Sequence, residues 1–201
     1  MPAYVVEIAL VVLAYALGSI SFGLIIAGRR GIDLRSVGSG NTGATNVGRA
    51  VGKREGRVVL LLDGLKGALP ALLAGAWSGL DSAWTAATAV AAVAGHCWPI
   101  WHQFRGGKGA ATAAGAMLVV AWPAGLAAIA TYLIAKRASR KVSVGSLAGA
   151  TVGAAVAIVG AATWDTGGHA AAFGACAIAL LVWIRHADNV ARLRRGEEPD
   201  G

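Results

Sequence analysis

The segment GSGNTGATN, residues 38–46, combines residue types that bind an oxyanion. Its glycines are Gly38, Gly40 and Gly43, and its polar side chains include those of Ser39, Asn41, Thr45 and Asn46. Glycine permits positive φ and close approach of the backbone, so neighbouring amides can converge on a phosphate. Arg49 follows as a planar, bidentate phosphate donor. An ordinary polar turn remains the alternative for this segment taken alone.

A second glycine turn, RGGKG at residues 105–109, carries a lysine at the start of a predicted helix. Its glycines are Gly106, Gly107 and Gly109. Lys108 supplies a cation and the helix N-terminus supplies free amides, so this turn is expected to bind an anion. It is not a nucleotide P-loop, because the glycine spacing differs and no Ser or Thr directly follows Lys108 to bind Mg²⁺.

The third polar segment, RHADNVARLRRGEE, spans residues 185–198. If it is helical, His186 and Asn189 are three residues apart and lie on the same face. An imidazole there can act as a general base or donate a hydrogen bond to phosphate, and both roles stay open.

The chain that positions these segments is mostly apolar. Of its 201 residues, 56% are hydrophobic and 14% are charged, and the apolar residues form long runs, as in an integral membrane protein. Residues 1–27 lack the basic start of a cleaved signal peptide and are interpreted as a retained helix. Cys97 and Cys176 lie apart in apolar surroundings, which indicates neither a disulfide nor a metal site.

Basic residues divide this apolar chain. Seventeen of its eighteen Lys and Arg residues fall in four clusters, at residues 29–57, 105–108, 136–141 and 185–195. Short loops rich in Lys and Arg stay cytoplasmic, so all four clusters are predicted to share that face. The same bias accounts for most of the net charge of +8, and no nucleic-acid partner is predicted.

The apolar stretches between the clusters predict the helices. Residues 58–101 and residues 142–184 are each long enough for two helices, with turns expected near Asp81 and Asp165. Within the first of these stretches, Asp63 and Lys66 are three residues apart and are expected to form a structural ion pair. His96 is expected to pack or bond inside the bundle.

Residues 110–135 can be interpreted in two ways. They fit one tilted span of about 39 Å, or two short helices hinged at Trp122 and Pro123. Only the hinged pair keeps every basic cluster on one face. The sequence therefore predicts an all-α integral membrane protein, a single domain over residues 1–201. It has seven transmembrane helices, two of them short and hinged near Pro123, with the N-terminus outside and the C-terminus cytoplasmic.

Several segments, in order along the chain, resemble the motifs of the acyl-phosphate-dependent glycerol-3-phosphate acyltransferases, the PlsY family. They are GSGNTGATNVGR, DGLKGALP, GHCWPIWHQFRGGKGAAT and RHADNVARLRRGEE. The resemblance implies an enzyme of the bacterial cytoplasmic (inner) membrane, with its active site facing the cytoplasm. It would move a fatty acyl group from acyl-phosphate to the 1-hydroxyl of sn-glycerol 3-phosphate. The products would be 1-acylglycerol 3-phosphate and phosphate. No cofactor, no metal and no obligate protein partner is implied.

Matching the family's motifs residue by residue implies specific roles. The implied catalytic residues are Ser39, Arg49, Lys108 and His186. The implied substrate-binding residues are Gly38, Gly40, Asn41, Thr45, Gly106, Gly107, Gly109 and Asn189. Glu198 takes the place of the acidic residue that ends the third motif. Because phosphate is already a good leaving group, such residues need only position the two substrates and offset the charge that grows during acyl transfer.

Two other functions remain open for the residues alone. A membrane transporter of small organic phosphates would also need anion-binding loops, although transporters usually bind their substrates near the bilayer midplane. A lipid phosphatase that uses His186 would need further acidic or metal-binding residues nearby, and Asp188 is the one candidate.

Overall fold

The computed structural model describes residues 3–163 and 168–201, and the regular elements in these ranges are helical. They are α1 (Ala3–Gly18), α2 (Phe22–Gly28), α3 (Ala44–Ala50), α4 (Lys53–Ser78), α5 (Ala83–Cys97), the 3-10 turn η1 (Ile100–His102), α6 (Ala110–Val120), α7 (Trp122–Ser139), α8 (Val142–Thr163), α9 (Gly168–Arg185) and α10 (Ala187–Arg195). The turn expected near Asp81 joins α4 to α5, whereas the one expected near Asp165 lies outside the described residues.

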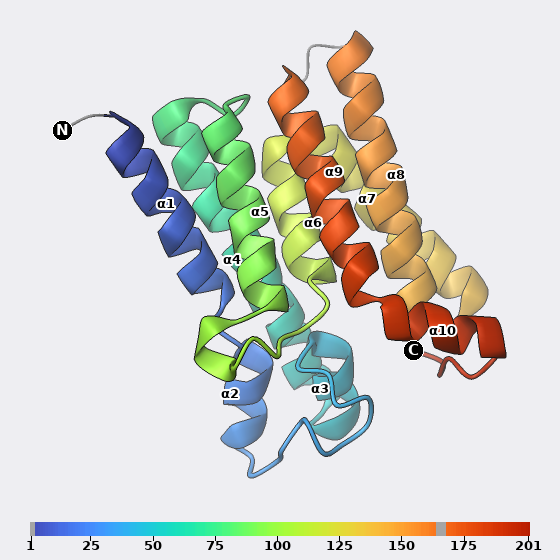
Figure 1. The fold of residues 1–201 in the computed structure, drawn as a ribbon. Helices are drawn as coiled ribbons and strands as arrows, with labels where there is room; N and C mark the ends of the chain where they lie inside the picture. Colours follow the sequence, from blue (N-terminus) through green and yellow to red (C-terminus); the bar gives the residue numbers. More distant parts are fainter. Residues whose placement is uncertain (1–2, 164–167) are drawn as a thin grey trace.

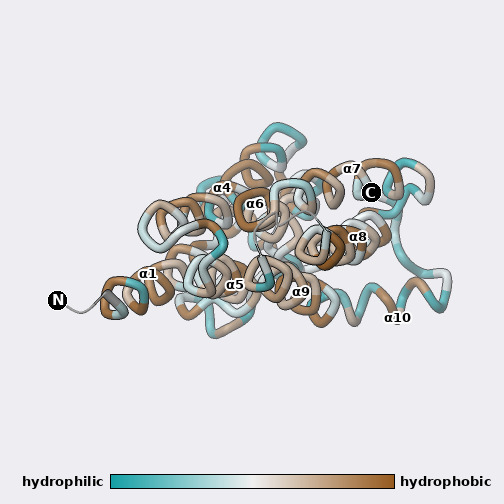
Figure 2. The backbone as a smooth tube through the Cα atoms, turned by 90° about the horizontal axis from the view of Figure 1, so that it is seen from above, coloured by the Kyte–Doolittle hydropathy of each residue, from teal (hydrophilic) through white to brown (hydrophobic). Residues whose placement is uncertain are grey.

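The long helices run side by side in one bundle, and α2, α3 and α10 lie at its lower end (Figure 1). Helix α7 packs along α8, α4 packs along α6, and α1 packs along α5. Seen from above, apolar segments appear throughout the bundle, whereas α10 extends beside it and carries hydrophilic segments (Figure 2). The prediction of an all-helical architecture is confirmed.

Large apolar side chains cover the outside of the bundle. Leu61, Ile134 and Phe173 expose 63%, 71% and 76% of their surface, which suits a hydrocarbon solvent rather than water. Among the described residues, the stretches long and apolar enough to cross a membrane are Tyr4–Gly28, Lys53–Ser78, Val142–Thr163 and Gly168–Arg185. The predicted count of seven crossings and the orientation of the termini stay predictions.

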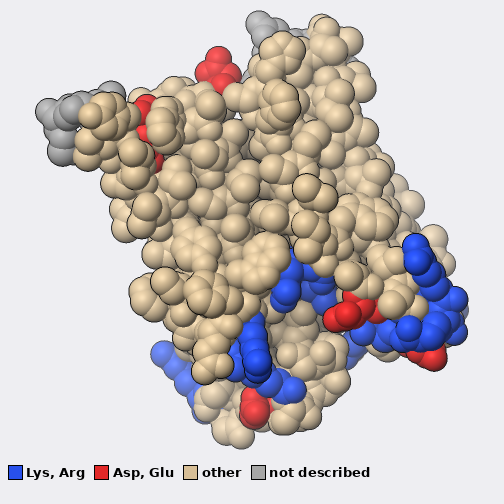
Figure 3. Space-filling model, in the orientation of Figure 1, with Lys and Arg blue, Asp and Glu red and all other residues tan. Residues whose placement is uncertain are grey.

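Lysine and arginine gather at one end of the molecule. In Figure 3 the blue atoms lie around the lower end, near α2, α3 and α10, and the upper body on this face is tan apart from a few acidic groups. The four basic clusters belong to the segment from α2 to the start of α4, the turn before α6, the end of α7, and the segment from the end of α9 through α10. They lie together at one end, as the charge pattern predicted.

The first predicted span, residues 1–27, is interrupted, because α1 and α2 are separate helices. The interruption is stabilised by polar contacts. Ser19 Oγ donates to the Tyr15 carbonyl at 2.8 Å, and Lys66 Nζ, from α4, donates to the Ile20 carbonyl at 2.7 Å. A carbonyl freed from helix bonding therefore finds a partner inside the protein, as a hydrocarbon environment requires.

The chain also breaks between α6 and α7. Ala121 leaves the helical region, with φ −154° and ψ 77°, and Pro123 lies in the first turn of α7, where its missing N–H costs little. The two helices pack against each other, so residues 110–135 form two helices instead of one continuous span. The pair is unequal in length, because α7 extends to Ser139.

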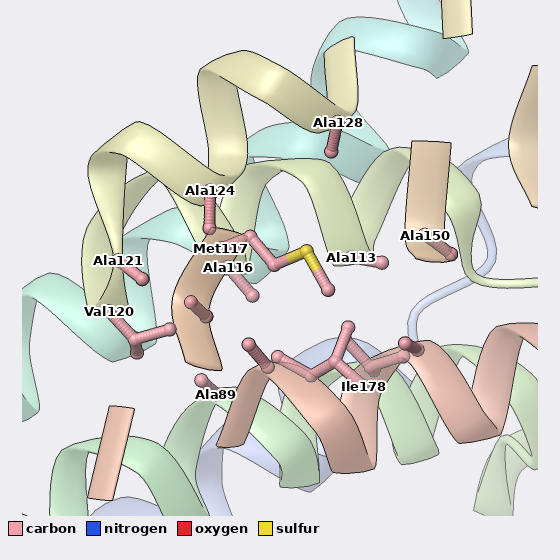
Figure 4. Packing of buried hydrophobic residues seen from close by; sticks show 14 of the residues in the cluster. Ala89, Ala113, Ala116, Met117, Val120, Ala121, Ala124, Ala128, Ala150 and Ile178 are labelled. Atoms are coloured by element: carbon pink, nitrogen blue, oxygen red, sulfur yellow. The ribbon is translucent and has the colours of Figure 1, made fainter. Parts of the chain in front are cut away.

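Small residues fill the centre of the bundle around Met117 and Ile178 (Figure 4). The surrounding alanines include Ala89, Ala113, Ala116, Ala124, Ala128 and Ala150. Small side chains allow helix backbones to approach closely, which drives helix association in a membrane. At the α4–α6 contact, for example, a Cβ on Gly67 would lie 2.1 Å from the Thr112 carbonyl oxygen.

We expect Gly115→Ala to destabilise the protein, and Gly64→Ala, at the same α4–α6 contact, to leave it stable. A Cβ on Gly115 would lie 2.0 Å from the Gly64 carbonyl oxygen, so the helices would have to separate. A Cβ on Gly64 would meet only the Ala111 carbonyl oxygen, at 3.8 Å. The expected loss for Gly115→Ala is about 1 to 3 kcal/mol, measured as a lower Tm in detergent. Equal Tm values for the two variants would contradict this packing.

Candidate active site

The first polar loop is held by one buried side chain. Asn46, on α3, donates from Nδ2 to the carbonyls of Leu34 and Val37, at 3.2 and 3.0 Å. Its Oδ1 accepts from the Ser39 amide at 3.1 Å. Asn46 exposes only 2% of its surface, and these three bonds satisfy its buried amide. The shape of the loop is therefore set by the protein itself.

The glycines of this loop fit the predicted anion nest only in part. Gly38 and Gly40 have φ of 59° and 66°, but Gly43 has φ of −81°, which any residue can adopt. The amides of Ser39, Gly40 and Gly43 all donate to acceptors within residues 37–46. These three amides hold the loop together and are not free to converge on an anion.

The second glycine turn rests directly on the end of α5. A Cβ on Gly106 would lie 2.2 Å from the His96 carbonyl oxygen, and one on Gly107 would lie 2.1 Å from His96 Nε2. The Gly107 amide donates to the His96 carbonyl at 3.1 Å. Only glycine fits at this distance, so the two residues fix the backbone that leads into Lys108. Gly109, with φ of 78°, then begins α6.

Arg185, at the end of α9, holds the same turn from another side. Its Nε donates to the Gly107 carbonyl and its Nη2 donates to the Gly106 carbonyl, both at 3.1 Å. Its guanidinium lies 5.4 Å from the centre of the Trp98 ring, a cation–π distance. The sequence counted Arg185 only as a basic residue of the fourth cluster, and nothing in the spacing indicated this contact with a turn 78 residues away.

His186 is a buried, neutral histidine at the junction of α9 and α10. Its Nδ1 is 2.7 Å from the Val182 carbonyl oxygen, and because a carbonyl only accepts, Nδ1 carries the proton and Nε2 carries a lone pair. Burial lowers the pKa of His186 to about 4, in spite of the hydrogen bond to Val182. The sequence left the role of this histidine open, because it could not show how deeply the ring is buried.

Asn189 and Glu198 form a polar pair beside His186. Asn189 Nδ2 donates to Glu198 Oε1 at 2.6 Å, and Arg192 Nε donates to Glu198 Oε2 at 2.8 Å. Burial alone would raise the pKa of Glu198, but hydrogen bonds from its neighbours outweigh burial and hold that pKa below its ordinary value. Glu198 is therefore ionised near neutral pH, and it orients the Asn189 amide so that Oδ1 has no partner within residues 3–163 and 168–201.

One cavity of about 620 Å³ brings most of the predicted site residues together. Those that line it are Ser39, Asn41, Thr45, Arg49, Lys108, Gly109, His186 and Asn189. Gly40 lines a second cavity instead, and Gly38, Gly106 and Gly107 line neither of the two. Gly106 and Gly107 shape the Lys108 turn through their contacts with the end of α5, and their role in binding substrate stays a prediction.

The same cavity continues into an apolar region between α4, α6 and α7. The apolar residues there include Leu61, Leu65, Ala114, Leu118, Ile129 and Leu133. Leu61 and Leu133 are also exposed on the outside of the bundle, so this region reaches the lipid-facing surface. The cavity therefore joins a cationic, hydrogen-bonding mouth to a region that suits a hydrocarbon chain.

A second cavity, of about 340 Å³, is bordered by the same two loops and by the junction of α9 and α10. It shares Ser39, Asn41, Lys108 and Arg192 with the first cavity. Its remaining polar side chains are those of Arg185 and Asp188. Lys108 therefore borders both a partly apolar cavity and a mostly polar one.

Two cations of the mouth differ in how they are held. Burial, together with the charge of Arg192, lowers the pKa of Lys108 to about 8. Arg49 is exposed, and its Nη2 donates to the main-chain carbonyl of Asp200, in the segment that follows α10. That segment crosses to α7 and α8, where Lys141 Nζ donates to the Glu198 carbonyl at 2.5 Å.

Among residues 3–163 and 168–201, no group of three or more His, Cys, Asp and Glu side chains is placed to hold a metal ion. The polar groups of the cavity are instead hydrogen-bond donors, acceptors and cations, which are the groups that bind phosphates and hydroxyls.

Comparisons with known proteins point to one family. A family model described as glycerol-3-phosphate acyltransferase matches residues 8–196. The glycerol-3-phosphate acyltransferase of Anaeromyxobacter dehalogenans is 47% identical, over 94% of each chain. That of Rhodospirillum rubrum is 44% identical, over 98% of this chain and 92% of its own.

Solved structures agree with these relatives. A crystal structure of PlsY, described as an integral membrane glycerol 3-phosphate acyltransferase in its glycerol 3-phosphate form, matches with a TM-score of 0.91 and 40% identity. The match covers 97% of this chain and 95% of that one. A lysophosphatidic acid form of PlsY matches with a TM-score of 0.89. The predicted multi-pass membrane architecture is thereby confirmed, and the chain belongs to the glycerol-3-phosphate acyltransferase family.

Proposed function

We propose that this chain transfers a fatty acyl group from acyl-phosphate to the 1-hydroxyl of sn-glycerol 3-phosphate. The products are 1-acylglycerol 3-phosphate (lysophosphatidate) and phosphate, in the first step of bacterial phospholipid synthesis. The observation that carries the proposal is the cavity of about 620 Å³, whose mouth is cationic and whose interior between α4, α6 and α7 is apolar. Acyl-phosphate combines an anionic phosphate, which suits the cationic mouth, with a hydrocarbon chain, which suits the apolar interior. Residues 1–201 act as one catalytic domain.

The residues at the mouth fit the charges of this reaction. The hydroxyl oxygen attacks the acyl carbonyl carbon, the bond between that carbon and the phosphate oxygen breaks, and the hydroxyl loses its proton. Negative charge grows on the carbonyl oxygen and on the departing phosphate. Lys108 and Arg49 offset this charge, and the Ser39 hydroxyl donates to a phosphate oxygen. Asn41 and Thr45 bind the substrate phosphates beside them.

His186 and Asn189 supply acceptors for the hydroxyl groups of glycerol 3-phosphate. The lone pair of His186 Nε2 is one acceptor, because Nδ1 is bound to Val182. Asn189 Oδ1 is the other, since it is buried and has no hydrogen-bond partner among the residues that the structure describes. The pKa of about 4 makes His186 a weak base, which favours a role in orienting the hydroxyl, with a substrate phosphate as the final proton acceptor.

The proposed setting is the bacterial cytoplasmic (inner) membrane, with the basic end of the bundle and the active site facing the cytoplasm. The clustering of Lys and Arg at that end supports this orientation, because basic loops stay cytoplasmic. It places the N-terminus outside and the C-terminus inside, with seven crossings. The bilayer and the two substrates are the partners that the site requires.

The alternative function, a transporter of small organic phosphates, is not supported. The matching family model and the similar curated proteins are all acyltransferases. The polar residues of the cavity also cluster at one end of the bundle, whereas a transporter site is usually built near the midplane from broken helices.

The decisive experiment supplies lipid-reconstituted protein with palmitoyl-phosphate, with and without glycerol 3-phosphate. We expect phosphate release that depends on the acceptor, together with lysophosphatidate. Lys108→Ala should lower kcat/KM by about 10-fold to 100-fold, equivalent to a charge-assisted contact of about 1.5 to 3 kcal/mol. Arg194→Ala is the matched control, because Arg194 is an exposed cation that lines neither cavity. Folded wild-type protein that forms no lysophosphatidate would contradict the proposal.

The affinity for glycerol 3-phosphate should fall in alkaline solution. Lys108 has a pKa of about 8, so its cation is present below that pH and is lost as the pH rises through it. We expect KM for glycerol 3-phosphate to rise by about tenfold from about pH 7.5 to about pH 9.5. In Lys108→Arg, which stays charged over this range, KM should change much less. The same alkaline rise in both proteins would assign the effect to another group.

The orientation can be tested with single cysteines in a Cys97→Ala, Cys176→Ala background. Ala138→Cys, in the exposed basic end of α7, should react with an impermeant thiol reagent only from the cytoplasmic side. Asp81→Cys, in the exposed turn between α4 and α5, should react only from the outside. Labelling of Ala138→Cys from outside would invert the proposed topology.

A further inference from the structure

We propose that Asp63 and His96 are positioning residues. They hold the backbone of the Gly106–Lys108 turn in the position from which Lys108 contacts the substrates. This inference rests on the proposed function, because it concerns how Lys108 is presented to the substrates. The sequence indicated only a structural ion pair between Asp63 and Lys66, and a histidine packed within the bundle. The structure links these three side chains to the turn.

The cluster lies inside the bundle, where α4 faces α5. Asp63 Oδ1 is 2.9 Å from Lys66 Nζ and 3.6 Å from His96 Nδ1. Asp63, Lys66 and His96 expose 3%, 7% and 8% of their surface. Lys66 also donates to the Ile20 carbonyl at the interruption between α1 and α2. Its ammonium lies 5.6 Å from the centre of the Phe22 ring.

His96 connects this cluster to the active site. Its ring lies directly under Gly107, where a Cβ would come within 2.1 Å of Nε2. Its carbonyl accepts the Gly107 amide at 3.1 Å. The next residue after Gly107 is Lys108. Rotation of the His96 ring would therefore push against the backbone that carries the cation of the site.

Asp63 is the group that faces the other side of this ring. His96 Nδ1 has no hydrogen-bond partner among the described residues, and Asp63 Oδ1 is the acidic atom opposite it. Both side chains line the same cavity as Lys108. Charged groups in a membrane bundle are costly, and a simple helix contact could be made by apolar residues at lower cost. The cluster is better explained by the orientation of the ring beneath the turn.

Two matched double variants separate this role from simple charge neutralisation. Asp63→Asn/Lys66→Met and Asp63→Leu/Lys66→Met both remove the buried ion pair and leave no unpaired charge. Only the asparagine variant keeps an oxygen opposite His96 Nδ1. Both variants lose the Lys66 contact with Ile20, so they differ mainly in the group that faces the ring. Each is compared with wild type for Tm, kcat, and KM of both substrates.

We expect Asp63→Asn/Lys66→Met to keep most of the wild-type kcat/KM. Asp63→Leu/Lys66→Met should lose about tenfold to 100-fold in kcat/KM at a similar Tm, because a displaced turn misplaces Lys108. Equal activities in the two variants would overturn the inference. A loss of kcat/KM that is explained by a lower Tm alone would also overturn it. Ser78→Ala is the control for that effect of stability on activity, because it removes a 3.0 Å hydrogen bond to Glu7 at the far end of α4.

A second measurement tests whether the cluster acts through Lys108. Binding of glycerol 3-phosphate is measured by thermal shift for Asp63→Leu/Lys66→Met, for Lys108→Ala, and for the triple variant. We expect Asp63→Leu/Lys66→Met to weaken binding of glycerol 3-phosphate when Lys108 is present. The same two substitutions should weaken binding little further in the triple variant, which lacks Lys108, because the effects of coupled residues are not additive. Additive losses would overturn the inference. Wild-type protein without lysophosphatidate synthesis would instead count against the proposed function.

Discussion

Where α1 crosses α5, a Cβ on Gly18 would lie 2.2 Å from the Ala92 carbonyl oxygen, and one on Gly95 would lie 2.2 Å from the Tyr15 carbonyl oxygen. Direct contact between backbones is the constraint on which the bundle depends, because lipid tails compete with every apolar side chain and leave close packing as the main attraction between helices. The active site depends on the same close contact between backbones. Gly106 and Gly107 bring the backbone of the Lys108 turn onto the end of α5 at a distance that no other residue allows.

Many polar groups of the site are already hydrogen-bonded to one another in the absence of substrate. Asn46 uses its whole amide to shape the first loop, and Glu198 fixes the Asn189 amide by a bond of 2.6 Å. His186 is held neutral by burial. The groups left to meet the substrates are a small set of cations, the hydroxyls of Ser39 and Thr45, and two acceptors. Such preorganisation reduces the rearrangement needed when charge develops on a phosphate.

Much of this arrangement could be predicted from the sequence, because it follows from composition and order. Long apolar runs predict helices, clustered Lys and Arg predict one basic end, and Trp122 with Pro123 predicts a break that the structure places at Ala121. Most of the site residues that the motifs predict line the cavity. What could not be predicted depends on distances between segments far apart in the chain. Arg185 holding the Gly106–Gly107 turn is one example. The burial that lowers the pKa of His186 is another, because a pKa depends on solvent access that residue order does not record.

The two cavities that border Lys108 differ in their linings. One reaches the lipid-facing side of the bundle through Leu61 and Leu133, and the other is lined mainly by polar side chains. A substrate dissolved in the bilayer and a substrate dissolved in water can then reach the same cation through different cavities, without passing each other. The two substrates can therefore be present together at Lys108.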